Sequence, residues 1–301
     1  MKRAAKKENS RKSRKNKPTQ ATKERILVVE HEESVRSFVV SMLTSAGYEC
    51  QETKGGLSAL AFLKSGEEFG LILTDIVNDE LGGIGLLERQ KQGFPDVPVV
   101  MMTTIQKIGY ACEAVRNGAY DYIFKPFERD LLLVIVRRAL EHRRLSLANR
   151  DCRKKLGPLS LTVPTPPKPR HILVQDDEEP MREIVSMMLT TADYRCRAVA
   201  SPKEVLDILT SGEQVDLVLC GLLETLEENF FKQMSKRFPG IPVAVLSACH
   251  DVSLFLPAFR DGAYDYLQKP FEREQLLIVV RRALEYRRLK LENRAYLPLL
   301  M

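Results

Sequence analysis

Short apolar runs alternate along the chain with segments in which apolar residues recur every three or four positions. Residues 26–29 form the first apolar run, and the segment 34–46 shows the second pattern. The first pattern is typical of a buried strand, and the second of an amphipathic helix. Further strand-like runs lie at 71–74, 97–102 and 120–124. This alternation predicts an α/β fold in which helices cover both faces of a parallel sheet.

The pattern occurs twice, because the chain contains an internal repeat. GAYDYIFKPFER at 118–129 matches GAYDYLQKPFER at 262–273 in ten of twelve positions. Upstream, RILVVEHEE at 25–33 matches HILVQDDEE at 171–179. A duplication of this size predicts two domains of one fold. The length of 301 residues agrees with this, since roughly 150 residues is usual for one domain.

Composition separates the two repeats from the segments around them. The N-terminal tail, residues 1–24, has ten Lys or Arg and two Glu and therefore a charge of +8. Because the net charge of the whole chain is +6, the remaining residues together carry a charge of −2. With so few apolar residues the tail cannot form a core, and we expect it to be disordered. The domains themselves do not have the charge of a nucleic-acid binder, which leaves a weak contact of the tail with a polyanion as a minor hypothesis. The predicted segments are a disordered basic tail at 1–24, a first domain at 25–148, a proline-rich linker at 149–169, a second domain at 170–292 and a C-terminal tail at 293–301.

The apolar pattern also excludes some classes of protein. The longest apolar run, 131–136, is far shorter than the 18 or so residues that cross a bilayer. No apolar stretch follows the basic start before Arg25, so this start does not resemble a secretory signal. The six cysteines are scattered and form no C-x-x-C pair, which favours reduced thiols. We therefore expect a cytoplasmic protein that does not bind membranes.

Polar residues follow the predicted strands of the first repeat. Glu30 and His31 follow the first strand, Asp75 follows the run at 71–74, and Thr103 and Lys125 come at the ends of the two later runs. In open α/β sheets, ligands bind outside the carboxyl ends of the strands. An Asp nucleophile, acidic metal ligands, a hydroxyl and an amine together suit Mg²⁺-assisted phosphoryl transfer.

Each repeat resembles a receiver domain of the response regulators of bacterial two-component signalling. Four stretches carry the resemblance in order and spacing, namely ILVVEHEE, LILTDIVNDELGG, PVVMMTT and YDYIFKPFE. The resemblance implies two doubly wound, flavodoxin-like (βα)5 domains, each with a five-stranded parallel sheet. It also implies that Asp75 is the phosphoacceptor, Thr103 the switch hydroxyl, Tyr122 the switch aromatic and Lys125 the lysine of the site, followed by a cis bond to Pro126.

The first repeat departs from the family pattern at the metal site. The family's first strand ends in two acidic residues, of which the second binds Mg²⁺, whereas this chain has Glu30 and His31. Because Mg²⁺ favours oxygen ligands, we expect a weak Mg²⁺ site of Glu30, His31 and Asp75, with Glu30 as the main ligand or with help from Glu32. His31 is either an exposed strand-end residue or a pH-sensitive regulator of the site.

The second repeat has the opposite defect. It keeps the acidic pair Asp176 and Asp177, together with Ser247 and Lys269, but Gly221 stands at the position of the phosphoacceptor. We therefore expect a pseudo-receiver, a degenerate site whose remaining polar residues are structural.

These observations predict a response regulator that is not an enzyme. Asp75 would accept a phosphoryl group from a sensor histidine kinase or a phosphotransfer protein. Only twelve residues follow Leu289, so we expect no output domain and signalling through protein contacts. The helix after each Lys-Pro-Phe extends past the usual domain end and is a candidate surface for a homodimer. The alternative is a receiver-like scaffold or dimerisation module that works without phosphorylation.

Overall fold

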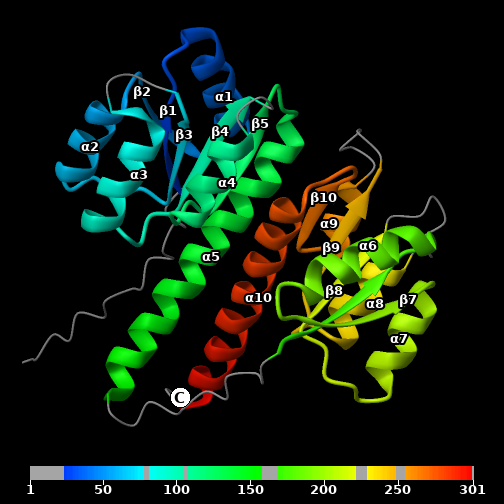
Figure 1. The fold of residues 1–301 in the computed structure, drawn as a ribbon. Helices are drawn as coiled ribbons and strands as arrows, with labels where there is room; N and C mark the ends of the chain where they lie inside the picture. Colours follow the sequence, from blue (N-terminus) through cyan, green and yellow to red (C-terminus); the bar gives the residue numbers. More distant parts are fainter. Residues whose placement is uncertain are drawn as a thin grey trace, which may run out of the picture.

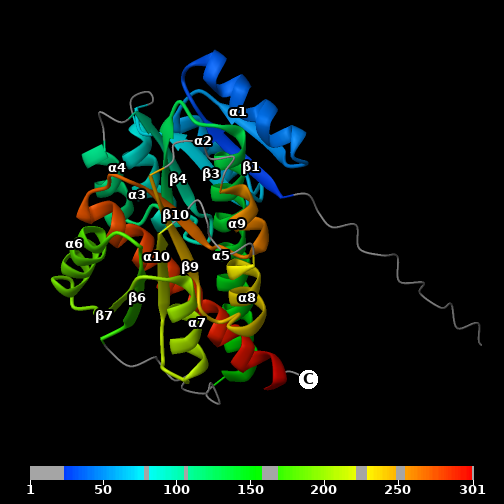
Figure 2. The ribbon, with the colours of Figure 1, turned by 90° about the vertical axis from the view of Figure 1, so that its right-hand side faces the viewer.

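The computed structural model describes residues 24–77, 81–104, 108–157, 169–221, 229–248 and 255–299. Within these ranges the chain forms two α/β units, and the first lies above the second in the views of Figures 1 and 2. The expectations for the basic tail and for most of the proline-rich linker concern residues outside the described part. Among the described helices, none is both long and apolar enough to cross a membrane.

The first unit alternates strands and helices as the hydrophobic pattern predicts. Its strands are β1 (Arg25–Val29), β2 (Glu49–Thr53), β3 (Leu71–Asp75), β4 (Val99–Thr104) and β5 (Asp121–Lys125). Its helices are α1 (Glu33–Ser45), α2 (Gly56–Lys64), α3 (Gly82–Gly93), α4 (Ile108–Arg116) and α5 (Arg129–Leu156). All neighbouring strands pair in parallel, in the order β2-β1-β3-β4-β5. This order confirms the predicted doubly wound fold.

The second unit repeats the first. Its strands are β6 (His171–Gln175), β7 (Arg195–Val199), β8 (Leu217–Gly221), β9 (Val243–Ser247) and β10 (Asp265–Gln268). Its helices are α6 (Glu179–Thr190), α7 (Pro202–Thr210), α8 (Phe230–Arg237), α9 (Leu256–Asp261) and α10 (Arg273–Tyr296), followed by the short 3-10 helix η4 (Leu297–Leu299). The strand order β7-β6-β8-β9-β10 is that of the first sheet, as expected for a duplication.

Alternating side chains of each central strand fill two cores. Ile26 and Val28 of β1 pack in one cluster with residues of α1 and α5, while Leu27 and Val29 pack in another with residues of α2, α3 and α4. All four side chains are fully buried. A strand that is covered on both faces has apolar residues at every position, which explains why polar and apolar residues do not alternate at 26–29.

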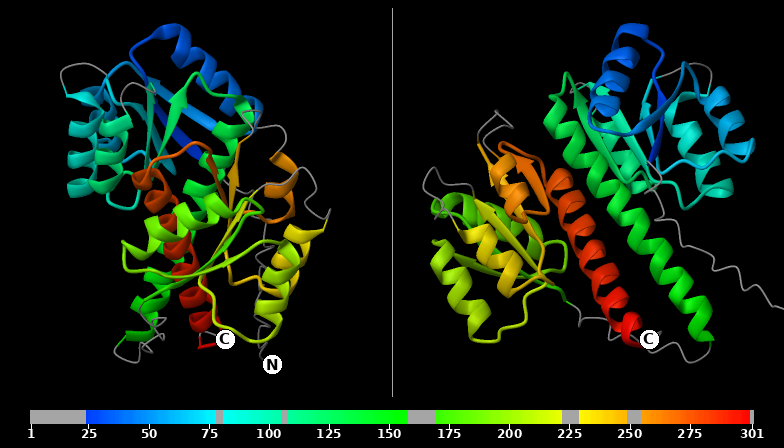
Figure 3. Two further views of the ribbon diagram at one scale, coloured as in Figure 1. Left: turned by 45° about the vertical axis from the view of Figure 1, so that its right-hand side comes forward. Right: turned by 180° about the vertical axis from the view of Figure 1, so that it is seen from behind.

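The long helices α5 and α10 join the two units. They lie side by side in Figures 1 and 3. Asn149 Nδ2 donates to the Leu289 carbonyl (2.9 Å), and Arg153 contacts Glu292 (2.6 Å) one turn further along both helices, so the helices run in the same direction. Because of this packing, α5 continues to Leu156. Residues 149–156, which we expected to begin the linker, are therefore helical. The surface expected to serve a homodimer is therefore used inside one chain.

A buried cluster of four charged residues lies where these helices leave their sheets. Arg138 of α5 and Arg282 of α10 each contact both Asp121 of β5 and Asp265 of β10. The four residues are between 1% and 9% exposed. Each arginine thus pairs with an aspartate of its own unit and with one of the other unit, which ties the two units together.

Candidate functional site

Three parallel strands of the first unit bring the predicted site residues to one edge of the sheet. Glu30 follows β1, Asp75 ends β3 and Lys125 ends β5. Lys125 Nζ lies 2.5 Å from Glu30 Oε2 and 3.0 Å from Asp75 Oδ2. Glu30 is fully buried and Asp75 is 7% exposed, so one ammonium group links two carboxylates that are shielded from solvent. The structure thus places these three residues together at one edge of the sheet.

His31 completes a three-residue group that could hold a cation. Its Nδ1 lies 3.1 Å from Glu30 Oε1 and 3.6 Å from Asp75 Oδ2. One ligand atom from each residue lies within 4.8 Å of the others. The imidazole is about half exposed, with 55% of its side chain accessible, while the carboxylates are buried. Carboxylate oxygens and an imidazole nitrogen are all metal ligands, so this donor set fits a divalent cation.

Hydrogen bonds from the first turn of α1 hold the site in place. The backbone N–H of Glu32 donates to Glu30 Oε1 (3.0 Å), and the buried Arg36 donates to the Glu30 carbonyl (2.8 Å). The Glu32 side chain accepts a hydrogen bond from Ser34 Oγ (2.6 Å) and is not part of the three-residue group. In this arrangement Glu32 contacts the site through its backbone, and a role as an additional ligand stays a prediction.

The two predicted switch residues lie on β4 and β5, the two strands beyond β3 in the sheet. Thr103 of β4 is buried, and its hydroxyl donates to the Thr104 carbonyl (3.3 Å). The Tyr122 hydroxyl on β5 accepts a hydrogen bond from Gln275 Nε2 of α10 (3.3 Å). Burial raises the pKa of the Tyr122 hydroxyl, which therefore stays protonated. No sequence pattern predicts this contact between Tyr122 and the second unit, because it depends on how the units dock.

The corresponding edge of the second unit has a different arrangement. Lys269 Nζ contacts Asp176 Oδ2 (2.6 Å), while Asp177 is exposed. A Cβ atom built on Gly221 would lie 2.5 Å from Asp176 Oδ2, so a larger residue does not fit there without movement. Ser247 is buried at the end of β9. The second edge thus retains one buried ion pair and has no carboxylate at the position that corresponds to Asp75.

Both units share one backbone feature at this edge. The bond from Lys125 to Pro126 is cis, as predicted, and so is the bond from Lys269 to Pro270.

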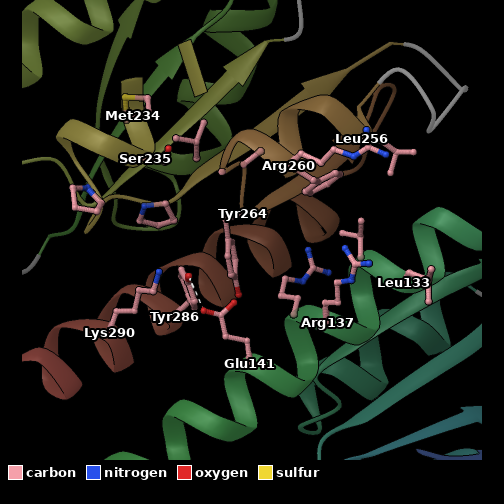
Figure 4. A pocket seen from close by; sticks show the side chains of 18 of the residues that line it. Leu133, Arg137, Glu141, Met234, Ser235, Leu256, Arg260, Tyr264, Tyr286 and Lys290 are labelled. Atoms are coloured by element: carbon pink, nitrogen blue, oxygen red, sulfur yellow. Dashed lines mark hydrogen bonds between the residues drawn. The ribbon is translucent and has the colours of Figure 1, made fainter. Parts of the chain in front are cut away.

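A cavity of about 600 Å³ lies between the units and away from this edge (Figure 4). Arg137 and Glu141 of α5 face Arg260 of α9 and Tyr286 of α10 across it. The Tyr286 hydroxyl donates to Glu141 Oε1 (3.1 Å). None of the residues that line the cavity belongs to the group around Asp75. The candidate site is therefore the sheet edge and not this cavity.

Comparison with known proteins gives one family for both units. The sequence model of the response regulator receiver domain family matches this chain twice, at residues 26–137 and at residues 172–281. The nitrogen assimilation regulatory protein NtrX of Azorhizobium caulinodans is 36% identical over 135 residues, which cover 44% of this chain and 30% of that protein. The transcriptional regulatory protein ZraR of Klebsiella oxytoca is 36% identical over 121 residues, 40% of this chain and 27% of that protein.

These relatives are much longer than the part that matches. The chain spans less than a third of the length of either one. Among solved structures, the receiver domain of NtrX from Brucella abortus is 38% identical and covers 38% of this chain and 98% of that chain, with a TM-score of 0.37.

Proposed function

The chain belongs to the response regulator receiver domain family, with one receiver domain at residues 26–137 and a second at 172–281, and we propose that the first accepts a phosphoryl group on Asp75. The observation that carries the proposal is the contact of Asp75 Oδ2 with Lys125 Nζ at 3.0 Å, beside the buried carboxylate of Glu30. A carboxylate is a competent nucleophile, and a fixed ammonium group offsets charge on phosphoryl oxygens.

The proposed donor is the phosphohistidine of a sensor histidine kinase or of a phosphotransfer protein. A carboxylate oxygen of Asp75 attacks phosphorus, and the bond between phosphorus and the donor's imidazole nitrogen breaks. The electrons of that bond leave with the imidazole, which takes up a proton, and Asp75 becomes an acyl phosphate. Lys125 stays in contact with the carboxylate and the transferred group throughout. A divalent cation bound by Glu30, His31 and Asp75 would supply further positive charge for the phosphoryl oxygens.

We propose that the signal leaves the site through protein contacts. Phosphorylation adds close to two negative charges beside Lys125. Thr103 and Tyr122, on the two strands beyond Asp75, are the residues proposed to respond. Support comes from the hydrogen bond between Tyr122 and Gln275 of the second receiver domain (3.3 Å), since a movement of Tyr122 would change this contact between the domains.

We propose that the second receiver domain is not phosphorylated. Gly221 offers no nucleophile, and Asp176 is held by Lys269 at 2.6 Å. The neighbouring thiol does not replace the carboxylate, because Cys220 is fully buried, donates to Gln175 Oε1 (2.8 Å) and has a pKa raised by burial. The remaining polar residues stabilise the sheet edge, and the domain serves as the docking partner of the first.

Replacing Gly221 by Asp is expected to destabilise the protein without creating a second acceptor. The new Cβ would come within 2.5 Å of Asp176 Oδ2, and overpacking of this kind costs about 1–3 kcal/mol. Urea unfolding of the full chain measures the effect. Gly109→Asp is the matched control, because a Cβ at the exposed Gly109 meets nothing within 4 Å. Phosphoryl uptake by Gly221→Asp beyond that of the wild type would contradict the expectation that an aspartate at this position does not become a second acceptor.

Intact mass after incubation with phosphoramidate and a divalent cation tests the function itself. We expect the wild-type chain to gain a phosphoryl group and Asp75→Asn to gain none, while both keep the same circular dichroism spectrum. Asp176→Asn, the matched change in the second domain, should behave as the wild type. Equal labelling of wild type and Asp75→Asn would rule out Asp75 as the acceptor. Absence of any adduct with every cation would favour the phosphorylation-independent scaffold instead.

A further inference from the structure

The ligand set beside Asp75 differs from the one that Mg²⁺ prefers. Mg²⁺ takes oxygen ligands in a nearly ideal octahedron, whereas imidazole suits the first-row transition ions. Here an imidazole nitrogen, His31 Nδ1, stands with two carboxylates at 3.1 Å and 3.6 Å. We infer that the site of the first receiver domain binds a divalent first-row transition ion in preference to Mg²⁺, with His31 as a direct ligand.

The distances from His31 Nδ1 to the two carboxylates are close to those between ligands around one ion. Two ligand atoms that are each about 2.1 Å from a metal, at right or tetrahedral angles, lie about 3.0–3.4 Å apart. His31 Nδ1 lies 3.1 Å from Glu30 Oε1 and 3.6 Å from Asp75 Oδ2. The first distance lies in this range and the second slightly above it, and all three ligand atoms lie within 4.8 Å of one another. The half-exposed imidazole leaves the remaining coordination positions open to water or to a phosphoryl oxygen.

The charges of the group also favour a cation. Two carboxylates share the single ammonium of Lys125, which contacts Glu30 Oε2 and Asp75 Oδ2. The other Glu30 oxygen, Oε1, faces His31. Each carboxylate thus has an oxygen near His31, which for Asp75 is the same Oδ2 that contacts Lys125, and the two carboxylates outnumber the one ammonium group.

The surroundings fix the backbone that carries His31. Arg36 Nη1 donates to the carbonyl groups of both Glu30 (2.8 Å) and His31 (3.3 Å). Residues that orient metal ligands in this way contribute to metal affinity. The second receiver domain has Asp177 at the position of His31, and no group of three metal-ligating side chains occurs among its described residues. The imidazole of His31 therefore lies in the receiver domain that has the proposed acceptor, Asp75.

Calorimetric titration of the full chain with Co²⁺ and with Mg²⁺ tests the inference. We expect the wild type to bind Co²⁺ more tightly than Mg²⁺. In His31→Asp, which restores an oxygen ligand, Co²⁺ affinity should fall and Mg²⁺ affinity should rise, so that their ratio drops by roughly tenfold or more, the size of effect that changes in a metal's surroundings produce. His142→Gln, which removes an imidazole of α5 far from the group, should leave the ratio unchanged.

Pulsed electron paramagnetic resonance of bound Mn²⁺ gives a second readout, which detects the nitrogen ligand directly. We expect a ¹⁴N coupling from a directly bound imidazole in the wild type and its loss in His31→Asp. Absence of this coupling, or an unchanged ratio of affinities in His31→Asp, would overturn the inference. The inference rests on the proposed function, because it places the metal beside the proposed acceptor Asp75. Metal binding is measured without phosphorylation, so the inference and the proposed function can fail separately. Phosphorylation with Mg²⁺ and no nitrogen coupling would refute only the metal preference.

Discussion

Arg138→Ala is expected to lower the free energy of unfolding by about 3–5 kcal/mol, the usual cost of removing one partner from a buried ion pair. Arg138 is 6% exposed and contacts Asp121 of its own domain and Asp265 of the other. Without it, two buried carboxylates share the single guanidinium of Arg282. The cost is large because charges that are shielded from water have few other ways to be compensated.

Urea unfolding, followed by circular dichroism and by hydrogen exchange of both domains, measures this loss. Arg137→Ala is the matched control. Arg137 is the preceding residue of α5, is exposed, and has no ion pair among the described residues, so its removal should change the stability by less than about 0.5 kcal/mol. Equal effects of the two substitutions would show that the charged cluster does not hold the domains together.

Lys125→Met is expected to slow phosphoryl uptake by Asp75 roughly 10²–10³-fold, as loss of one preorganised charge-stabilising group does in other active sites. Lys125 Nζ is the ammonium group that contacts both Asp75 (3.0 Å) and Glu30 (2.5 Å). Methionine keeps most of the length and apolar volume of the side chain. The change therefore removes the positive charge while it disturbs the packing little.

The rate of mass gain with phosphoramidate, at saturating cation, provides the measurement. The duplication supplies a matched control, since Lys269→Met breaks the corresponding contact with Asp176 (2.6 Å) in the second domain. This variant should take up phosphate as fast as the wild type. An unchanged rate in Lys125→Met, or the same loss in both variants, would contradict the role given to Lys125.

The sheet and most of the site followed from the hydrophobic pattern. Parallel strands place their carboxyl ends at one edge, so the positions of Glu30, Asp75 and Lys125 directly after apolar runs were enough to predict that they meet. The position of His31 next to Glu30 was equally plain in the sequence. Its orientation toward Asp75, with 3.6 Å between Nδ1 and Oδ2, required the structure, because a strand-end side chain can point to solvent as readily as to a neighbour.

The contact between the domains could not be predicted, although the residues that form it occur at equivalent positions in the two repeats. Asp121 and Asp265 occupy the same place in the two GAYDY motifs, and Arg138 and Arg282 the same place in the two VRRAL motifs. A repeated Asp and Arg are equally compatible with an ion pair inside each domain. Only the docking of α5 on α10 shows that each arginine also reaches the other domain's aspartate.

The central claim is that this chain takes one phosphoryl group, on Asp75. The most direct test is to phosphorylate the full chain with phosphoramidate, reduce the acyl phosphate with borohydride, digest the protein and locate the modified residue by mass spectrometry. The proposal predicts a single modified position, Asp75, and none in residues 172–281. A modified residue in the second domain, or no modification with any divalent cation, would contradict it.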